Sequence, residues 1–225
     1  MTPLRAVLFD IDGTLVDSNY LHVDAWHRGL AEAGAPAPAS RIHRAIGMDS
    51  GKLLEALAGE ASEETRTRAK ELHSDYYKKA ASRLRAFDGA QDLLRSIADR
   101  GLKVVLATSA PEDELELLLG VLDVDDTLAV VTSAADVDAA KPDPDILQVA
   151  LEKAEVGAGQ ALLVGDTVWD VRAATAAGLP TIGVESGGVS GAELREAGAI
   201  EVYEDVAQLL ERLDESPIGQ RLGKP

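Results

Sequence analysis

Short aliphatic runs that alternate with stretches of helical periodicity are the feature that most constrains the fold of this chain. The runs lie at residues 7–9, 104–107, 128–131, 161–164 and 181–184. A strand that is apolar at every position must be covered on both faces, and the helices between consecutive strands of a parallel sheet provide that cover. The alternation therefore predicts an α/β fold with a doubly wound parallel sheet.

The region between the first run and the others, residues 18–86, has a different pattern. It shows no convincing strand, and its helical patterns lie at residues 21–33, 52–58 and 62–84. We expect an inserted α-helical cap domain over residues 18–86 and a core domain made of residues 1–17 and 87–225. Turn-forming residues at both junctions would allow the cap to hinge as a lid.

Composition excludes several classes of function. With 225 residues and 46% hydrophobic content the chain can bury a full core. A formal net charge of −17, without a basic stripe, argues against nucleic acid as a partner. The chain has no Cys, which excludes disulfides, a thiolate zinc site and a cysteine nucleophile. Because neither a signal peptide nor a membrane span is visible, we expect a cytoplasmic monomer or homodimer that does not bind membranes.

Two carboxylates, Asp10 and Asp12, directly follow the first aliphatic run and precede Gly13. Open α/β sheets place their ligands at the carboxyl edge, and side chains two apart on a strand point the same way. Like charges at this spacing raise one pKa or recruit a divalent metal, and their hard oxygen atoms suit Mg²⁺. The alternative is an ordinary turn of Asp and Gly with no chemistry.

A second polar signal, Thr108 and Ser109, follows the run at 104–107. Ser109 with Glu112 three residues later predicts a capping box at a helix start. A hydroxyl at a strand end beside the N–H groups that open a helix also makes an anion seat. Both hydroxyls are therefore candidate phosphate-binding groups, and the two interpretations are compatible.

Two further signals follow later strands. Lys141 precedes Pro142 at a rigid position, where an ammonium group would offset nearby carboxylates and a transferring phosphoryl group, although most loop lysines are simply solvated. Asp166 and Asp170 follow the run at 161–164. Asp166 could simply cap the helix, but a spacing of four at a helix start brings both carboxylates to the same side.

All four signals occur in this order, each at the carboxyl end of a predicted strand, and together they resemble the motifs of the haloacid dehalogenase superfamily. Those motifs are present as Asp10-Ile11-Asp12-Gly13-Thr14-Leu15-Val16-Asp17-Ser18, Thr108, Lys141-Pro142, and Gly165-Asp166 with Asp170. The inserted region resembles the helical cap of the phosphoglycolate phosphatase and β-phosphoglucomutase branch. The resemblance implies a Rossmann-like core and a Mg²⁺-dependent phosphatase for a small phosphorylated metabolite.

Individual roles follow from the resemblance alone. Asp10 would attack phosphorus and carry an aspartyl-phosphate, and Asp12 would act as general acid and then general base. Mg²⁺ would be held by Asp10, Asp166 and the backbone carbonyl of Asp12, with Asp170 orienting water around the ion.

Phosphate and leaving-group contacts complete the expected site. Thr108 and Lys141 would hold the phosphoryl oxygens, with Ser109 beside them. The cap would supply contacts to the leaving group, and its candidate residues are His22, Arg41, His43, Arg44 and Lys52. Each of these cap residues could instead belong to a solvated helix face.

Two alternatives to the hydrolase remain open. A phosphomutase of the β-phosphoglucomutase type would carry an Arg soon after the cap-loop Gly47, where this chain has Ser50. A non-catalytic phospho-accepting or phosphate-binding regulatory protein would combine similar residues, but signalling receivers of that kind are shorter and lack the helical insert. Asp12 argues against carbon–halogen cleavage, because dehalogenases that resemble this fold lack a second Asp there.

Overall fold

A computed structural model of the chain describes residues 2–133, 136 and 143–222. The chain divides into two compact units. One unit contains the residues up to Asp17 together with those from Arg85 onward, and the other spans Ser18–Leu84.

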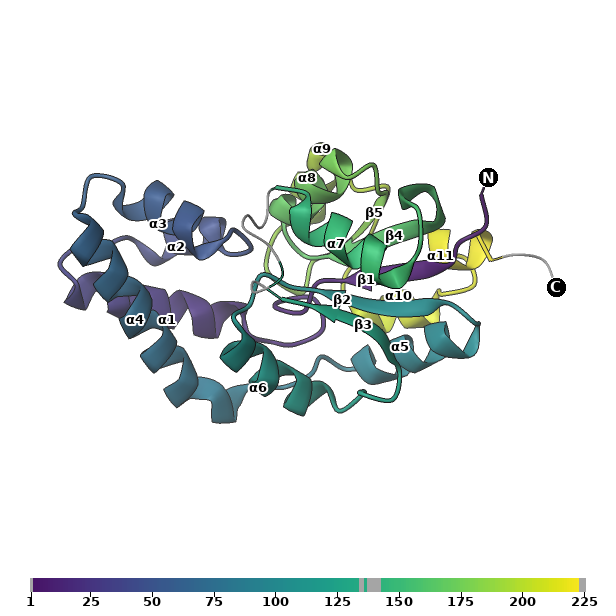
Figure 1. The fold of residues 1–225 in the computed structure, drawn as a ribbon, viewed down its shortest axis with the longest axis horizontal. Helices are drawn as coiled ribbons and strands as arrows, with labels where there is room; N and C mark the ends of the chain where they lie inside the picture. Colours follow the sequence, from purple (N-terminus) through teal and green to yellow (C-terminus); the bar gives the residue numbers. More distant parts are fainter. Residues whose placement is uncertain (1, 134–135, 137–142, 223–225) are drawn as a thin grey trace. The chain divides into compact units, whose positions relative to one another are not determined.

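The first unit is built on a six-stranded parallel sheet with the order β3-β2-β1-β4-β5-β6 (Figure 1). Its strands are β1 (Ala6–Phe9), β2 (Lys103–Ala107), β3 (Leu128–Thr132), β4 (Ala161–Gly165), β5 (Thr181–Val184) and β6 (Glu201–Tyr203). In a Rossmann-like sheet of this order the direction of winding reverses between β1 and β4. Ligands bind outside the carboxyl ends of the strands at that reversal.

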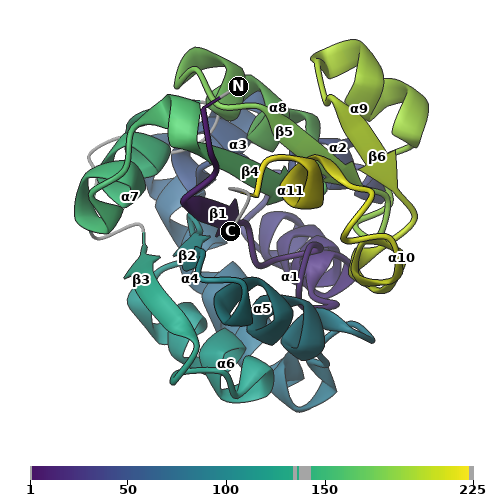
Figure 2. The ribbon, with the colours of Figure 1, turned by 90° about the vertical axis from the view of Figure 1, so that its right-hand side faces the viewer.

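Helices cover both faces of the sheet. They are α5 (Ala90–Asp99), α6 (Glu112–Leu122), α7 (Asp145–Ala154), α8 (Val168–Ala176), α9 (Gly191–Ala197), α10 (Val206–Glu211) and α11 (Pro217–Gln220), with a 3-10 turn, η3 (Ala158–Gln160). Figure 2 shows α7 and α8 on one side of the sheet and α5 and α10 on the other. The doubly wound α/β prediction is therefore confirmed.

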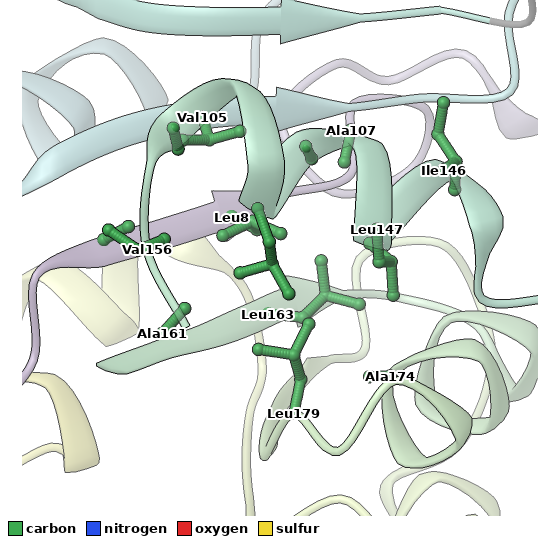
Figure 3. Close-up of a cluster of buried hydrophobic side chains, with 14 of the residues drawn as sticks. Leu8, Val105, Ala107, Ile146, Leu147, Val156, Ala161, Leu163, Ala174 and Leu179 are labelled. Carbon is green, nitrogen blue, oxygen red and sulfur yellow. The ribbon is translucent and has the colours of Figure 1, made fainter. Parts of the chain in front are cut away.

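Alternate residues of the strands pack under α7 and α8. Leu8, Val105 and Leu163 point to this face and meet Leu147 of α7 and Ala174 of α8 (Figure 3). Each of these side chains is completely buried. Because the other face is covered as well, apolar residues are needed at every position of the inner strands.

One strand of the sheet, β6, was absent from the sequence prediction. It is three residues long and lies at the sheet edge, paired with β5 only. An edge strand of this length needs no aliphatic run, and here only Tyr203 is buried. The remaining strands agree with their predicted runs to within one residue at each end.

The segments that connect the first unit to the second run side by side. The N–H of Asp17 donates to the carbonyl of Arg85 at 2.9 Å, and the N–H of Phe87 donates to the carbonyl of Leu15 at 2.9 Å. An antiparallel bridge joins Val16 to Ala86 between them. The junctions on either side of the inserted region therefore form a short two-stranded ladder.

The second unit is entirely helical over its described elements, α1 (Asn19–Glu32), α2 (Ala39–Ala45), α3 (Ser50–Ala58), α4 (Glu63–Ala80) and the 3-10 turn η1 (Ala81–Arg83). Helices α1 and α4 pack closely at Gly29, where a Cβ atom would lie 3.0 Å from the carbonyl oxygen of Ala69. Helix α2 escaped prediction because it has seven residues and buries only Ile42 and Ala45. None of the described helices in either unit is long and apolar enough to cross a bilayer.

Candidate active site

Asp10 and Asp166 emerge beside each other at the point where the winding of the sheet reverses. Asp10 follows the last residue of β1, and its N–H donates to the carbonyl of Val164 in β4 at 3.0 Å. Asp166 follows Gly165, the last residue of β4. The pairing of β1 with β4 thus brings together two carboxylates that are 156 positions apart in the chain.

Three carboxylates form a buried cluster at this edge. Asp10, Asp166 and Asp170 each offer an oxygen atom, and these atoms all lie within 4.8 Å of one another. Asp166 is completely buried, and its Oδ1 accepts a hydrogen bond from Thr14 Oγ1 at 3.1 Å. Buried like charges at this distance are costly without a counter-charge, and hard carboxylate oxygens suit Mg²⁺. The donor set therefore fits a magnesium ion.

Asp12 lies outside that cluster of carboxylates, in a turn rather than on a strand. Strand β1 ends at Phe9, so the expectation that Asp10 and Asp12 share one face of a strand is wrong. The turn closes through the N–H of Gly13, which donates to the carbonyl of Val16 at 2.8 Å. Gly13 has a φ of +76°, a backbone conformation that glycine adopts without strain. Asp12 is half-buried in this turn.

Asp170 is held by the start of helix α8. Its Oδ2 accepts hydrogen bonds from Thr167 Oγ1 at 2.5 Å and from the N–H of Thr167 at 3.1 Å, and Thr167 Oγ1 accepts from the N–H of Asp170. This is a reciprocal capping box, so the helix cap is Thr167 and not Asp166. Asp166 is consequently not needed to cap the helix.

Gly165 makes room for the Asp170 side chain. A Cβ atom at position 165 would lie 2.7 Å from the Cβ and 2.8 Å from the Cγ of Asp170. Carbon atoms in van der Waals contact are normally about 3.5–4.0 Å apart. Only glycine at this position leaves the Asp170 carboxylate where it is.

Thr108 follows β2 and is almost fully buried. Its Oγ1 accepts a hydrogen bond from the N–H of Ala110 at 3.1 Å, and a hydroxyl that accepts in this way still has its own proton to donate. Ser109 does not cap the following helix, because α6 begins at Glu112 with Pro111 as its N-cap. The predicted capping box of Ser109 and Glu112 is therefore wrong, since Glu112 is the first helical residue and not the third.

Lys141 lies outside the described residues. The helix that follows it, α7, begins at Asp145 with Pro144 at its N-cap. The role of Lys141 therefore stays a prediction.

The candidate substrate residues of the second unit are spread over its first three helices, with His22 on α1, Arg41, His43 and Arg44 on α2, and Lys52 on α3. Arg41 donates to the carbonyl of Ala56 at 2.9 Å, and the His43 ring stacks on Tyr20 with ring centroids 5.2 Å apart. Arg44 is exposed, and Lys52 is half-buried. Contact between any of these residues and a substrate stays a prediction.

His22 belongs to a buried stack of rings within the second unit. Its Nδ1 lies 3.0 Å from Nε2 of His73, and one of these nitrogens donates to the other. His22 stacks on Tyr77 with centroids 4.0 Å apart, and His73 stacks on Trp26 at 4.1 Å. Burial holds the pKa of His73 well below its ordinary value of 6.5, and the charges of His22 and Lys70 lower it further.

Sequence reasoning missed the supporting roles of three residues of the first unit, Thr167, Gly165 and Ser186, although it named Gly165 as part of a motif. Thr167 was open to detection, because Thr167-Val168-Trp169-Asp170 has the spacing of a capping box. The need for glycine at position 165 comes from its contact with Asp170 in the first turn of α8, and no local sequence pattern predicts that contact. Ser186, whose Oγ donates to the carbonyl of Gly13 at 2.7 Å, acts across 173 positions of the chain.

Comparisons with known proteins agree with this geometry. A family model described as haloacid dehalogenase-like hydrolase matches residues 7–184. A phosphoglycolate phosphatase of Rhodospirillum rubrum is 34% identical over 97% of this chain and 95% of its own length.

Solved structures are also similar. A hydrolase from Pseudomonas syringae has a TM-score of 0.90 and 37% identity, covering 94% of this chain and 98% of its own. A putative β-phosphoglucomutase from Bacteroides vulgatus has a TM-score of 0.89 over 99% of this chain and 91% of its own, at 23% identity, which shows similarity of fold alone.

Proposed function

The chain belongs to the haloacid dehalogenase-like hydrolases, and on that basis we propose that it is a Mg²⁺-dependent phosphatase that cleaves a small phosphorylated metabolite through an aspartyl-phosphate. The observation that carries the proposal is the buried group of Asp10, Asp166 and Asp170, whose oxygen atoms lie within 4.8 Å of one another at the carboxyl edge of the sheet. Such a group has little structural use, because burying like charges together destabilises a fold.

The first chemical step would transfer the phosphoryl group to Asp10. A carboxylate oxygen of Asp10 attacks phosphorus while the bond from phosphorus to the leaving oxygen breaks. Asp12 donates its proton to that oxygen, so that an alcohol leaves rather than an alkoxide. Its half-buried position in a turn, apart from the buried cluster, supports a role in moving protons rather than holding charge.

The second step would hydrolyse the aspartyl-phosphate. Asp12, now a carboxylate, takes a proton from water as the water oxygen attacks phosphorus, and the bond to Asp10 breaks. Inorganic phosphate leaves, Asp10 returns as a carboxylate, and Asp12 is protonated again. Between the two steps Asp10 changes from nucleophile to leaving group, and Asp12 changes from general acid to general base.

Charge neutralisation and orientation would come from the surrounding groups. Asp10, Asp166 and the backbone carbonyl of Asp12 would hold Mg²⁺, which supplies positive charge against the phosphoryl oxygens. Thr14 orients Asp166 through its hydrogen bond, and Thr167 orients Asp170. Thr108 can donate its hydroxyl proton to a phosphoryl oxygen, because the N–H of Ala110 already donates to that hydroxyl.

Release of inorganic phosphate from a substrate panel tests the proposal. The full chain with Mg²⁺ is assayed against phosphoglycolate, sugar phosphates and nucleotides, beside Asp10→Asn and a control, Asp125→Asn, which changes an exposed carboxylate. We expect the wild type and the control to release phosphate from at least one small ester and Asp10→Asn to release none. Substantial turnover by folded Asp10→Asn would exclude Asp10 as the nucleophile.

A mutase is distinguished in the same assay. A mutase must hold a sugar bisphosphate, and Ser50 stands where the β-phosphoglucomutase branch carries an Arg. With β-glucose 1-phosphate and a trace of glucose 1,6-bisphosphate, we expect free phosphate to form faster than glucose 6-phosphate. The opposite order of rates would replace the hydrolase by a phosphomutase.

A further inference from the structure

Ser186 makes a long-range hydrogen bond to the turn that carries Asp12. Its Oγ donates to the carbonyl oxygen of Gly13 at 2.7 Å, although the two residues are 173 positions apart. Ser186 lies two residues after the end of β5, in the loop that leads to α9. The bond therefore connects the loops that follow β5 and β1 at the carboxyl edge of the sheet.

The loop around Ser186 is fixed on both sides of the hydroxyl. The N–H of Glu185 donates to the carbonyl of Tyr203 at 3.0 Å, which extends the pairing of β5 with β6. The N–H of Gly188 donates to the carbonyl of Glu185 at 2.9 Å and closes a tight turn, with Gly188 at a φ of +92°. The carboxylate of Glu185 also accepts from the N–H of Gly191, the first residue of α9. These bonds fix the backbone around Ser186, so its half-buried hydroxyl is held in position to donate to Gly13.

The acceptor of this bond lies between two residues of the proposed mechanism. Gly13 follows Asp12, the proposed acid and base, and precedes Thr14, whose hydroxyl donates to Asp166. Within the turn, the N–H of Gly13 donates to the carbonyl of Val16, and the N–H groups of Thr14, Leu15 and Val16 donate to the carbonyl of Ile11 at 3.2, 2.9 and 3.0 Å. The carbonyl of Gly13 accepts none of these bonds. The carbonyl of Gly13 belongs to the peptide that joins Gly13 to Thr14. Glycine tolerates a wide range of backbone angles, so an external hydrogen bond to this carbonyl restrains the turn one residue after Asp12.

We propose that Ser186 is a positioning residue for proton transfer, which holds the Gly13 turn so that the Asp12 carboxyl stays aligned with the leaving oxygen. This inference rests on the proposed phosphatase function. It assigns Ser186 no contact with the substrate. The loop after β5 then contributes to protonation of the leaving oxygen by Asp12, through its hydrogen bond to the backbone of the turn after β1.

Leaving-group dependence separates this role from a merely structural one. A p-nitrophenolate ion leaves without a proton, whereas an alkoxide needs the general acid. The two esters share the second step, so the comparison uses kcat/KM, which reports on the transfer of the phosphoryl group to Asp10. Ser186→Ala should lower kcat/KM about tenfold on phosphoglycolate, or on whichever alkyl phosphate the panel shows to be hydrolysed fastest, and less than about twofold on p-nitrophenyl phosphate. Ser186→Thr, which keeps a hydroxyl, should restore most of the kcat/KM on the alkyl ester.

Ser190→Ala is the matched control. Ser190 lies in the same loop and caps α9, accepting from the N–H of Glu193 at 3.4 Å, so its loss should lower stability without selecting between esters. An equal loss on both esters, no loss on either, or the same selectivity in Ser190→Ala would each overturn the inference while the phosphatase function stands. A wild type that hydrolyses neither ester nor any member of the panel would overturn the function itself, and this inference with it.

Discussion

Gly165→Ala tests whether the absence of a side chain at position 165 keeps Asp170 in the buried cluster with Asp10 and Asp166. The new methyl group would lie 2.7 Å from the Cβ of Asp170, about 1 Å closer than van der Waals contact between carbon atoms permits, and 3.1 Å from its Oδ2. Either the end of β4, which is buried, or the first turn of α8, in which Asp170 is buried, must move. Movement of the Asp170 carboxylate would also break the two hydrogen bonds that it accepts from Thr167.

The expected cost has two parts. Overpacking of a buried site costs about 1–3 kcal/mol, and loss of a helix cap costs about 1 kcal/mol. We therefore expect Gly165→Ala to lower the free energy of unfolding by about 2–4 kcal/mol, which corresponds to a fall in Tm of roughly 4–16 °C for a chain of this length. The stabilisation that Mg²⁺ gives should fall as well, because one carboxylate has left the cluster.

Urea unfolding of the purified protein, in EDTA and in excess Mg²⁺, measures both effects. Gly120→Ala is the control, since Gly120 lies inside α6 with nothing within 4 Å of its Cβ position, and this substitution should stabilise by about 0.5–1 kcal/mol. If Gly165→Ala unfolds at the wild-type urea concentration and gains as much stability from Mg²⁺, the clearance has no structural or metal-binding role.

Three further outcomes are expected. In EDTA, Asp10→Asn should be at least as stable as the wild type, because an amide removes one of the clustered charges; a clear loss of stability would show that the cluster is not repulsive. Excess Mg²⁺ should stabilise the wild type by about 2.7 kcal/mol at a hundred times its Kd, and identical unfolding curves with and without EDTA would exclude a bound ion. Because the pKa of folded His73 lies below 6.5, the unfolded chain binds the extra proton as pH falls, so stability should be full above about pH 6.5 and decline below it by up to about 1.4 kcal/mol per pH unit. Urea unfolding at each pH, followed by the fluorescence of Trp26 in a Trp169→Phe background, measures that decline. His73→Gln should make stability less dependent on pH. The control, His27→Gln, changes an exposed residue of the same helix as Trp26 and should leave the dependence as it is.

The sequence predicted five of the six strands of the sheet and missed β6. Residues 104–107 and 161–164 are aliphatic throughout because α7 and α8 cover one face of β2 and β4 and other helices cover the second face. Strand β6 has one neighbour in the sheet and is only three residues long, so its composition does not differ from that of a loop. Burial on both faces leaves a pattern in the sequence, whereas a three-residue edge strand does not. The other edge strand, β3, is five residues long and was predicted from the run at residues 128–131.

Helix starts were harder to predict than strands, because several residues near each start can satisfy the free N–H groups. Asp166 and Thr167 are both good N-cap residues, and Thr167 is the cap because α8 begins at Val168. Asp166 instead accepts a hydrogen bond from the hydroxyl of Thr14, and the hydroxyl of Thr167 donates to Asp170. The N-cap of α6 is Pro111, whose ring fixes the backbone angle φ at about −65°, and the hydroxyl of Ser109 does not cap this helix.

Strand order accounts for what local patterns could not predict at the site. The motif residues were visible as polar groups that end aliphatic runs, but only the order β2-β1-β4-β5 decides which loops are neighbours. Because β1 pairs with β4, Asp10 and Asp166 lie together, although β2 and β3 separate their strands in the chain. The same order places the loop after β5 close enough for Ser186 to reach Gly13. A serine outside every motif thus becomes a neighbour of the site, and its contribution can be found only by testing the contact that the fold creates.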